Sequence, residues 1–249
     1  MDRRHFLHII SAHGVTSFLP IYAGAQSDLS RIDVPTKSRA VRNGVQTGFR
    51  AGVVGVGRAG LDVLSMLIVR LPTYFRMIAI STVAEPLENM PAHRRILVGG
   101  VPHKRIKSDD AHRSNVRRNA WAASGQIDEA VTGLDVVLVV AGMGCVAGTV
   151  LSTVVAQVAR KRRIFTIGIP ILPFDWEGEK RNHTARNGAR EFGHCVHSLY
   201  PIHNDAMARD AGELATVDDV FSKTFMAVRE LCLRETTDSR LDAQYARLR

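Results

Sequence analysis

Apolar residues recur along the chain in two alternating patterns, short continuous runs and longer stretches with helical spacing. Runs typical of buried strands cover 51–56, 77–83, 134–141, 164–171 and 196–202. Helical spacing, or polar sequence that favours helix, covers 61–71, a segment that ends near Ala123, 150–160, 178–193 and the region after Thr216. This alternation predicts an α/β fold, a doubly wound and mostly parallel sheet with its ligand at the carboxyl ends of the strands.

Two glycine-rich turns each follow a predicted strand and open a predicted helix. The first is Gly55-Val56-Gly57-Arg58-Ala59-Gly60, and the second runs from Gly142 to Thr149. Such a turn exposes backbone N–H groups and directs a helix dipole at one point, which makes an anion site. The first turn fits the dinucleotide pattern G-x-G-x-x-G, but Glu85 comes slightly late for the acid that closes the second Rossmann strand. The sequence holds no G-x-x-x-x-G-K-[ST] motif, which disfavours a P-loop NTPase.

The second turn is the most specific segment of the sequence. The run from Ala141 to Thr149 (AGMGCVAGT), after a strand rich in valine, resembles the phosphate-binding signature A-G-M-G-G-G-T-G-T-G of the tubulin/FtsZ superfamily. Further segments match that family in the same order. They are 55–60 (G-V-G-G-G-G in the family), 80–82 (I-N-T), 173–181 (P-F-x-F-E-G-x-x-R), 202–205 (I-P-N-D) and 217–221 (A-D-N-V-L). Residues from about 50 to 235 are therefore identified as a divergent bacterial FtsZ-like chain with a Rossmann-like GTPase domain.

The resemblance implies a set of nucleotide-binding residues. Backbone groups around the first turn would contact some of the nucleotide phosphates, and the second turn would bind the remaining ones. Glu177 and Arg181 match the pair that contacts ribose and phosphate, Asn204 matches the I-P-N-D amide, and Asp218 matches the acid that accepts from guanine. The full candidate set is Gly57, Arg58, Ala59, Gly60, Asp62, Gly142, Gly144, Ala147, Gly148, Thr149, Glu177, Arg181, Asn204 and Asp218. The expected ligand is GTP or GDP, with or without Mg²⁺, and no separate metal site is predicted.

Simpler interpretations stand beside these assignments. Glu177 and Arg181 are spaced as a surface i,i+4 ion pair. Asp218 lies where the dipole of a helix favours any acid. The first glycine turn could simply close a strand–helix unit.

Several departures from the family pattern bear on activity. Cys145 and Val146 replace a glycine pair and would crowd the turn, Ala147 replaces a threonine, and the basic segment 104–118 replaces a glycine-rich loop. The family's catalytic loop and second domain follow the long central helix, but this sequence ends at Arg249. Only Asp238 and Asp242 occupy the loop region, with the wrong spacing. These features predict weak or absent intrinsic hydrolysis, and no catalytic residue is assigned.

Charge and length complete the picture. The chain has 249 residues, and 33 Lys+Arg against 24 Asp+Glu give a net charge of +9, which favours polyanionic partners. The first hypothesis is a guanine-nucleotide-binding protein that takes part in membrane remodelling or in cytoskeletal assembly, with a protein partner or with its own copies. The alternative is a degenerate scaffold that binds an acidic partner or an anionic membrane through its basic face. Nucleic acid is the weakest option, because aromatic residues do not interleave the basic ones.

The N-terminus allows two interpretations. Residues 1–45 form an extension, followed by the nucleotide-binding domain at 46–249. Arg3 and Arg4 with the moderately apolar stretch behind them resemble a twin-arginine export signal, but His8, His13 and Pro20 interrupt that stretch. A flexible arm on a cytoplasmic or membrane-associated protein is the other interpretation.

Overall fold

The computed structural model describes residues 50–99, 109–212 and 214–237. The predicted extension at 1–45 and the basic residues 104–107 lie outside these ranges. Seven strands are described: β1 Ala51–Val56, β2 Phe75–Ser81, β3 Arg94–Leu97, β4 Val136–Gly142, β5 Phe165–Leu172, β6 Ser198–Leu199 and β7 Ile202–His203. The helices are α3 Gly57–Ile68, α4 Glu85–Glu88, α5 Asp109–Ala122, α6 Ser124–Val131, α7 Val146–Lys161, α8 Glu179–Gly193, α9 Asn204–Ala211 and α10 Val217–Thr237, with a 3-10 turn at Asp175–Glu177.

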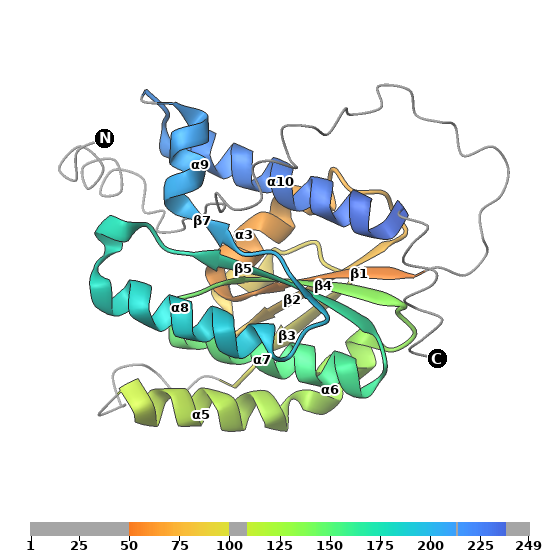
Figure 1. Ribbon diagram of the computed structural model, residues 1–249. Coiled ribbons are helices and arrows are strands. Elements are labelled where there is room, and N and C mark those ends of the chain that lie inside the picture. Colours follow the sequence, from red (N-terminus) through yellow and green to blue (C-terminus); the bar gives the residue numbers. More distant parts are fainter. Residues whose placement is uncertain (1–49, 100–108, 213, 238–249) are drawn as a thin grey trace, which may run out of the picture.

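The strands form one sheet in the order β3-β2-β1-β4-β5-β6, and β7 also pairs with β5 (Figure 1). Every described strand pair is parallel. The sheet starts at β1, extends outward through β2 and β3, and then continues with β4, β5 and β6 on the other side of β1. This is the doubly wound arrangement that the alternation of strands and helices predicts.

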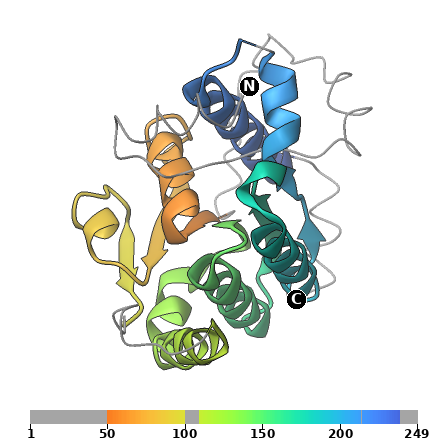
Figure 2. The ribbon, with the colours of Figure 1, turned by 90° about the vertical axis from the view of Figure 1, so that its left-hand side faces the viewer.

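Helices cover both faces of the sheet, and each face has its own apolar core. One core packs α3, α9 and α10 against alternate residues of β1, β2, β4 and β5. The other packs α5, α6, α7 and α8 against the remaining residues of the same strands. Figure 2 shows α9 and α10 on one side of the sheet and α5, α7 and α8 on the other. The central strands are therefore buried on both faces, which explains why their sequences are continuous apolar runs.

The structure changes some predicted boundaries. Helices α3 and α7 begin at Gly57 and Val146, four residues before the predicted starts, so Gly57 and Gly60 belong to the first turn of α3 and Gly148 to that of α7. The predicted strand at 196–202 is divided into two short strands, β6 and β7. Strand β3 was missed inside a basic stretch, because an edge strand with only Ile96 buried shows no alternating pattern. Thr216 caps α10 as predicted, since its Oγ1 accepts from Asp219 N at 3.3 Å.

The described helices include none that is long and apolar enough to cross a membrane.

Candidate functional site

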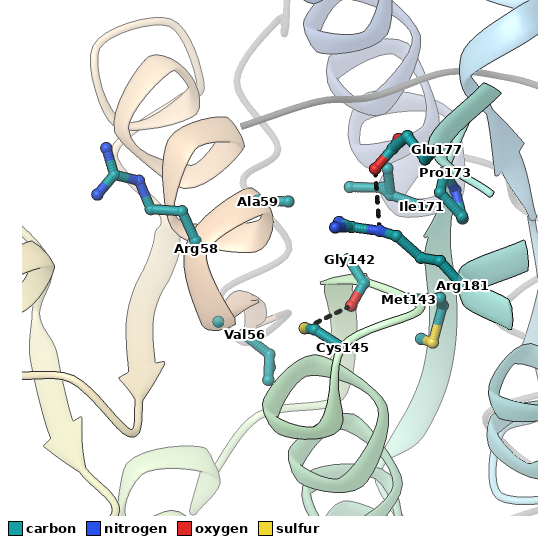
Figure 3. A pocket seen from close by; sticks show the side chains of 11 residues that line it. Val56, Arg58, Ala59, Gly142, Met143, Cys145, Ile171, Pro173, Glu177 and Arg181 are labelled. Carbon is teal, nitrogen blue, oxygen red and sulfur yellow. Dashed lines mark hydrogen bonds and ion pairs between the residues drawn. The ribbon is translucent and has the colours of Figure 1, made fainter. Parts of the chain in front are cut away.

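A cavity of about 230 Å³ opens at the carboxyl edge of the sheet, where β1 and β4 lie side by side. Strand order reverses at this point, and a doubly wound sheet leaves a crevice there. The cavity is lined by the two glycine-rich turns, the end of β5 and the start of α8 (Figure 3). Its lining residues are Val56, Gly57, Arg58, Ala59, Gly142, Met143, Cys145, Ile171, Pro173, Glu177 and Arg181.

The two turns lie against each other, and their glycines make this possible. A Cβ on Gly142 would lie 2.8 Å from Ala59 Cβ, and a Cβ on Gly60 would lie 2.4 Å from the carbonyl oxygen of Val140. Gly144 has a φ of 83°, a left-handed conformation that other residues rarely adopt. The first turns of α3 and α7 therefore meet at the cavity, and both helix dipoles act there.

Cys145 does not crowd the second turn as the sequence suggested. Its φ of −118° is ordinary extended backbone, and its side chain caps α7 by accepting from Gly148 N at 3.4 Å. The thiol also donates to the carbonyl oxygen of Gly142 at 3.8 Å (Figure 3). A cap in place of a glycine therefore fixes the start of α7 while leaving Cys145 exposed at the cavity.

Glu177 is the buried anchor of the opposite wall. Only 8% of its side chain is exposed, and its Oε2 lies 2.9 Å from Nε of Arg181. Its Oε1 accepts from Phe174 N at 2.8 Å and from Asn204 Nδ2 at 3.2 Å. Burial raises the pKa of Glu177, while Arg181 and the two hydrogen bonds oppose that rise. The pair is thus more than a surface i,i+4 contact, because its acid is buried and holds three separate segments.

Asn204 brings a second buried polar group to the same wall. Its side chain is fully buried, and its amide donates to Glu177. Within the described residues, its Oδ1 has no hydrogen-bond partner. A buried carbonyl oxygen without a donor is costly, so a ligand or an ordered water is expected to satisfy it.

Two residues outside the predicted set hold the loop that carries Glu177. The buried Asn182 donates to the carbonyl oxygens of Phe174 at 2.9 Å and Gly178 at 3.2 Å. Asp205 accepts from Asp175 N at 3.0 Å. Burial raises the pKa of Asp205, and that hydrogen bond opposes the rise. Asn182 directly follows the matched motif P-F-x-F-E-G-x-x-R, and Asp205 is the last position of I-P-N-D.

Comparison with known proteins decides the family. Residues 50–212 match the family model described as "Tubulin/FtsZ family, GTPase domain". The chain belongs to the Tubulin/FtsZ family. The family that the sequence motifs indicate is confirmed, and with it the α/β fold of the GTPase domain.

Individual relatives agree with this assignment. The chain is 28% identical over 192 residues to "Cell division protein FtsZ 1" of Pyrococcus horikoshii, covering 75% of this chain and 51% of that protein. The solved structure "FtsZ dimer, empty (M. jannaschii)" has a TM-score of 0.66 at 24% identity, over 78% of this chain and 57% of the other. The solved structure "CetZ2 from Haloferax volcanii - GTPgS bound protofilament" has a TM-score of 0.61 at 21% identity. The match covers 77% of this chain and 61% of the other. The chain thus spans about half the length of the curated relatives it matches.

The structure brings six of the predicted site residues into the cavity lining, namely Gly57, Arg58, Ala59, Gly142, Glu177 and Arg181. The other eight surround it or lie apart. Gly60, Gly144, Ala147, Gly148 and Thr149 belong to the two turns but are not lining residues, and Asn204 lies behind Glu177. Asp62 lies 3.3 Å from Nε of Arg58, whose side chain extends away from Glu177 and Arg181 (Figure 3).

Asp218 is exposed on the first turn of α10 and does not line the cavity. Its neighbour Asp219 accepts from both the backbone N–H and the hydroxyl of Thr216, so it is occupied as a helix cap. Of the two acids, it is therefore Asp219, and not Asp218, that takes part in the cap of α10.

Sequence reasoning missed the apolar part of the lining, which comprises Val56, Met143, Ile171 and Pro173. These residues carry no chemical signal of their own. Their shared position at or just after the carboxyl ends of β1, β4 and β5 is the signal that identifies them. Among the described residues, no three His, Cys, Asp or Glu side chains are placed to hold a metal ion.

Proposed function

We propose that this chain binds guanine nucleotide in the cavity between β1, β4 and β5. The observation that carries the proposal is the position of that cavity. It lies at the strand-order reversal of a Tubulin/FtsZ-family GTPase domain, and both glycine-rich turns line it. Relatives of the chain include a CetZ2 protofilament solved with bound GTPgS.

The phosphates would lie between the first turns of α3 and α7. Backbone N–H groups of Gly57, Ala59, Gly144 and Ala147 supply donors that need no side chain, and the two helix dipoles favour negative charge there. Arg181 adds a guanidinium from the opposite wall, where Glu177 fixes its direction. Mg²⁺ would be held mostly by the phosphates and water, because the described residues contain no prearranged metal site.

Guanine would be recognised by Asp218 and Asn204. A carboxylate accepts from both the N1–H and the 2-amino group of guanine, and adenine offers neither donor in that arrangement. A base donor at Asn204 would satisfy its buried Oδ1. Adenine would leave these acceptors unpaired, which is the physical basis of the expected selectivity.

Hydrolysis by the isolated chain is expected to be weak or absent. Glu177 is the one carboxylate among the residues that line the described cavity, and it is held by Arg181, Asn204 and Phe174 N. An acid whose two oxygens are taken up by three contacts is a poor base for activating water. Activation would therefore need an acid from a partner protein or a second copy, in line with assembly into a cytoskeletal polymer in the cytoplasm, where nucleotide is abundant.

Calorimetry with GTP, GDP and ATP tests the proposal. We expect heat from GTP and GDP and much weaker binding of ATP. Asp218→Ala should lower the preference for GTP over ATP by about tenfold to a hundredfold, the value of one lost hydrogen bond to a charged group. Asp219→Ala is the matched control: it removes the neighbouring acid and a helix cap, and should leave the GTP-to-ATP ratio unchanged.

One result would overturn nucleotide binding, and another would overturn the argument on hydrolysis. If millimolar GTP produces neither heat in calorimetry nor a thermal shift, nucleotide binding is excluded. Rapid phosphate release by the pure protein would contradict the argument that the cavity lacks its own activating acid.

A further inference from the structure

The end of the molecule opposite the cavity gathers cations that lie far apart in the sequence. The parallel register sets Ala51 beside both Phe75 and Val136, and Val136 beside Phe165. The residues just before these positions therefore share one rim, the N-terminal edge of the sheet. Arg50, Tyr74 and Asp135 lie on it directly, and Arg163 precedes β5 by two residues.

Four arginines from four segments converge on residues 128–135, which end α6 and lead into β4. Arg50 N donates to Asp135 at 2.8 Å. Arg76 donates to the carbonyl oxygens of Ala130 at 2.9 Å and Thr132 at 2.8 Å. Arg94 pairs with Glu129, and Arg162 pairs with Asp128.

The end of α7 adds three more cations to the same rim. Arg160 donates to the carbonyl oxygen of His194 at 3.2 Å, and Lys161 Nζ lies 4.8 Å from the ring centre of Trp121. Arg163 has a φ of 58° in the turn into β5. Among the described residues, these seven cations share the rim with the three acids Asp128, Glu129 and Asp135, a net charge of +4 for this set. All three acids are already paired with Arg162, Arg94 and Arg50.

A helix C-terminus favours basic residues, and this accounts for part of the cluster, at 160–163. It does not account for Arg50 and Arg76, which precede or begin strands. The remainder of the other basic stretch, 95–118, behaves differently where it is described. Arg113 and Arg117 both pair with Glu191, and Arg95 donates to the carbonyl oxygen of Glu88. The N-terminal edge is therefore the strongest basic surface that these contacts define.

Exposed apolar side chains accompany the cations. Val69 is 75% exposed at the end of α3, and Tyr74 is 50% exposed directly before β2. Cations beside exposed aliphatic and tyrosine side chains suit the headgroup region of an anionic bilayer, where basic residues meet phosphate and tyrosine reaches the interface. Nucleic acid fits less well, because the ring of Trp121 is covered by Lys161 and is not presented for base stacking.

We propose that the N-terminal edge of the sheet docks on an anionic membrane surface. The cations at 50, 76, 94 and 160–163 would lie over lipid phosphates, with Val69 and Tyr74 entering the headgroup region. In this orientation the cavity at the carboxyl edge faces away from the membrane and stays open. The surface does not depend on nucleotide binding, so each proposal stands or fails without the other.

The test uses the full chain and sedimentation with vesicles of phosphatidylcholine, with and without one third phosphatidylglycerol. Binding should require the anionic lipid and decrease as salt is raised. The triple variant Arg160→Gln, Lys161→Gln, Arg163→Gln should bind about a hundredfold more weakly, since each cation near the surface contributes roughly fivefold. These side chains are exposed, so thermal unfolding of the variant should resemble that of the parent.

A matched control removes the same charge from the other end of the molecule. This control is the triple variant Lys180→Gln, Arg186→Gln, Arg209→Gln, whose positions lie on α8 and α9. It should leave vesicle binding unchanged. The pair Val69→Ser, Tyr74→Ser should weaken binding without altering its salt dependence. The proposal would be overturned if the control variant lost as much vesicle binding as the 160–163 variant. It would also be overturned if the protein bound neutral vesicles as tightly as anionic ones. Tighter binding to duplex DNA than to anionic vesicles, lost in the 160–163 variant, would assign the surface to nucleic acid instead.

Discussion

Glu177 shows how one buried side chain connects the parts of the site. It joins the loop at 173–178, Asn204 on α9 and Arg181 on α8 through its two oxygens. Burial has the largest influence on the pKa of Glu177 and raises it, which means that the charged form of the side chain is destabilised in this place. Its hydrogen bonds, by contrast, satisfy two donors that have little access to water. The shape of the acid therefore contributes more to stability than its charge.

We expect Glu177→Gln and Glu177→Ala to differ clearly in stability. Gln keeps an acceptor for Phe174 N and Asn204 Nδ2 and loses only an ion pair with the half-exposed Arg181, so its cost should stay below about 1 kcal/mol. Ala leaves two donors unsatisfied and should cost about 2–3 kcal/mol. Urea unfolding measures both free energies. If both variants lost the same free energy of unfolding, the ion pair with Arg181, and not the hydrogen bonds, would be what holds this wall of the cavity.

At the scale of elements, the packing of α8 on α7 positions Arg181 across from the second turn. The two helices approach closely at Gly188, where a Cβ would lie 2.4 Å from Cγ2 of Thr149. Thr149 is fully buried and belongs to the first turn of α7. A small residue on α8 therefore sets how near the Glu177–Arg181 wall comes to the glycine turns.

Gly188→Ala should consequently destabilise the protein, although alanine favours helix. Overpacking at a fixed helix contact costs about 1–3 kcal/mol, more than the gain in helix propensity. Gly125→Ala in α6 is the control, since a Cβ there would meet nothing within 4 Å. That variant should gain up to about 1 kcal/mol from propensity alone. Thermal or urea unfolding of both variants provides the comparison, and a stabilised Gly188→Ala would contradict the close contact.

On the scale of the whole molecule, charge makes stability depend on pH. The chain already carries +9 at pH 7, so acid adds repulsion as carboxylates and histidines take up protons. His203 in β7 adds a specific effect. Burial lowers its pKa to about 4, Asp175 opposes the change, and the charges of Arg209 and Arg186 reinforce it.

We therefore expect stability to fall as the pH is lowered from 6.5 to about 4. In this window the unfolded chain binds a proton at His203 that the folded protein excludes, so folding is favoured above it and weakened below it. His203→Gln should flatten part of this dependence in urea titrations at several pH values. Added salt should recover the part that comes from general repulsion. An unchanged slope in the variant would show that His203 is freely protonated in the folded state.

The sequence by itself determined the main elements of the fold. The central strands are continuous apolar runs because both their faces are buried, and such runs are readable without any tertiary information. The two turns and the ordered motifs at 141–149, 173–181 and 202–205 sufficed to identify the family. Glycine and motif positions carry this information because the backbone there has few alternatives.

Only the tertiary structure decided which residues meet. Asn182 and Asp205 support the loop of Glu177, and the rim cations come from segments up to 113 residues apart, between Arg50 and Arg163. The edge strand β3 and the basic runs gave no reliable signal. Exposure and ion pairing depend on neighbours that are distant in the chain, as Glu191 shows by pairing with Arg113 and Arg117. Local pattern fixes the buried elements, whereas the parallel register of the sheet determines what gathers at each of its two ends.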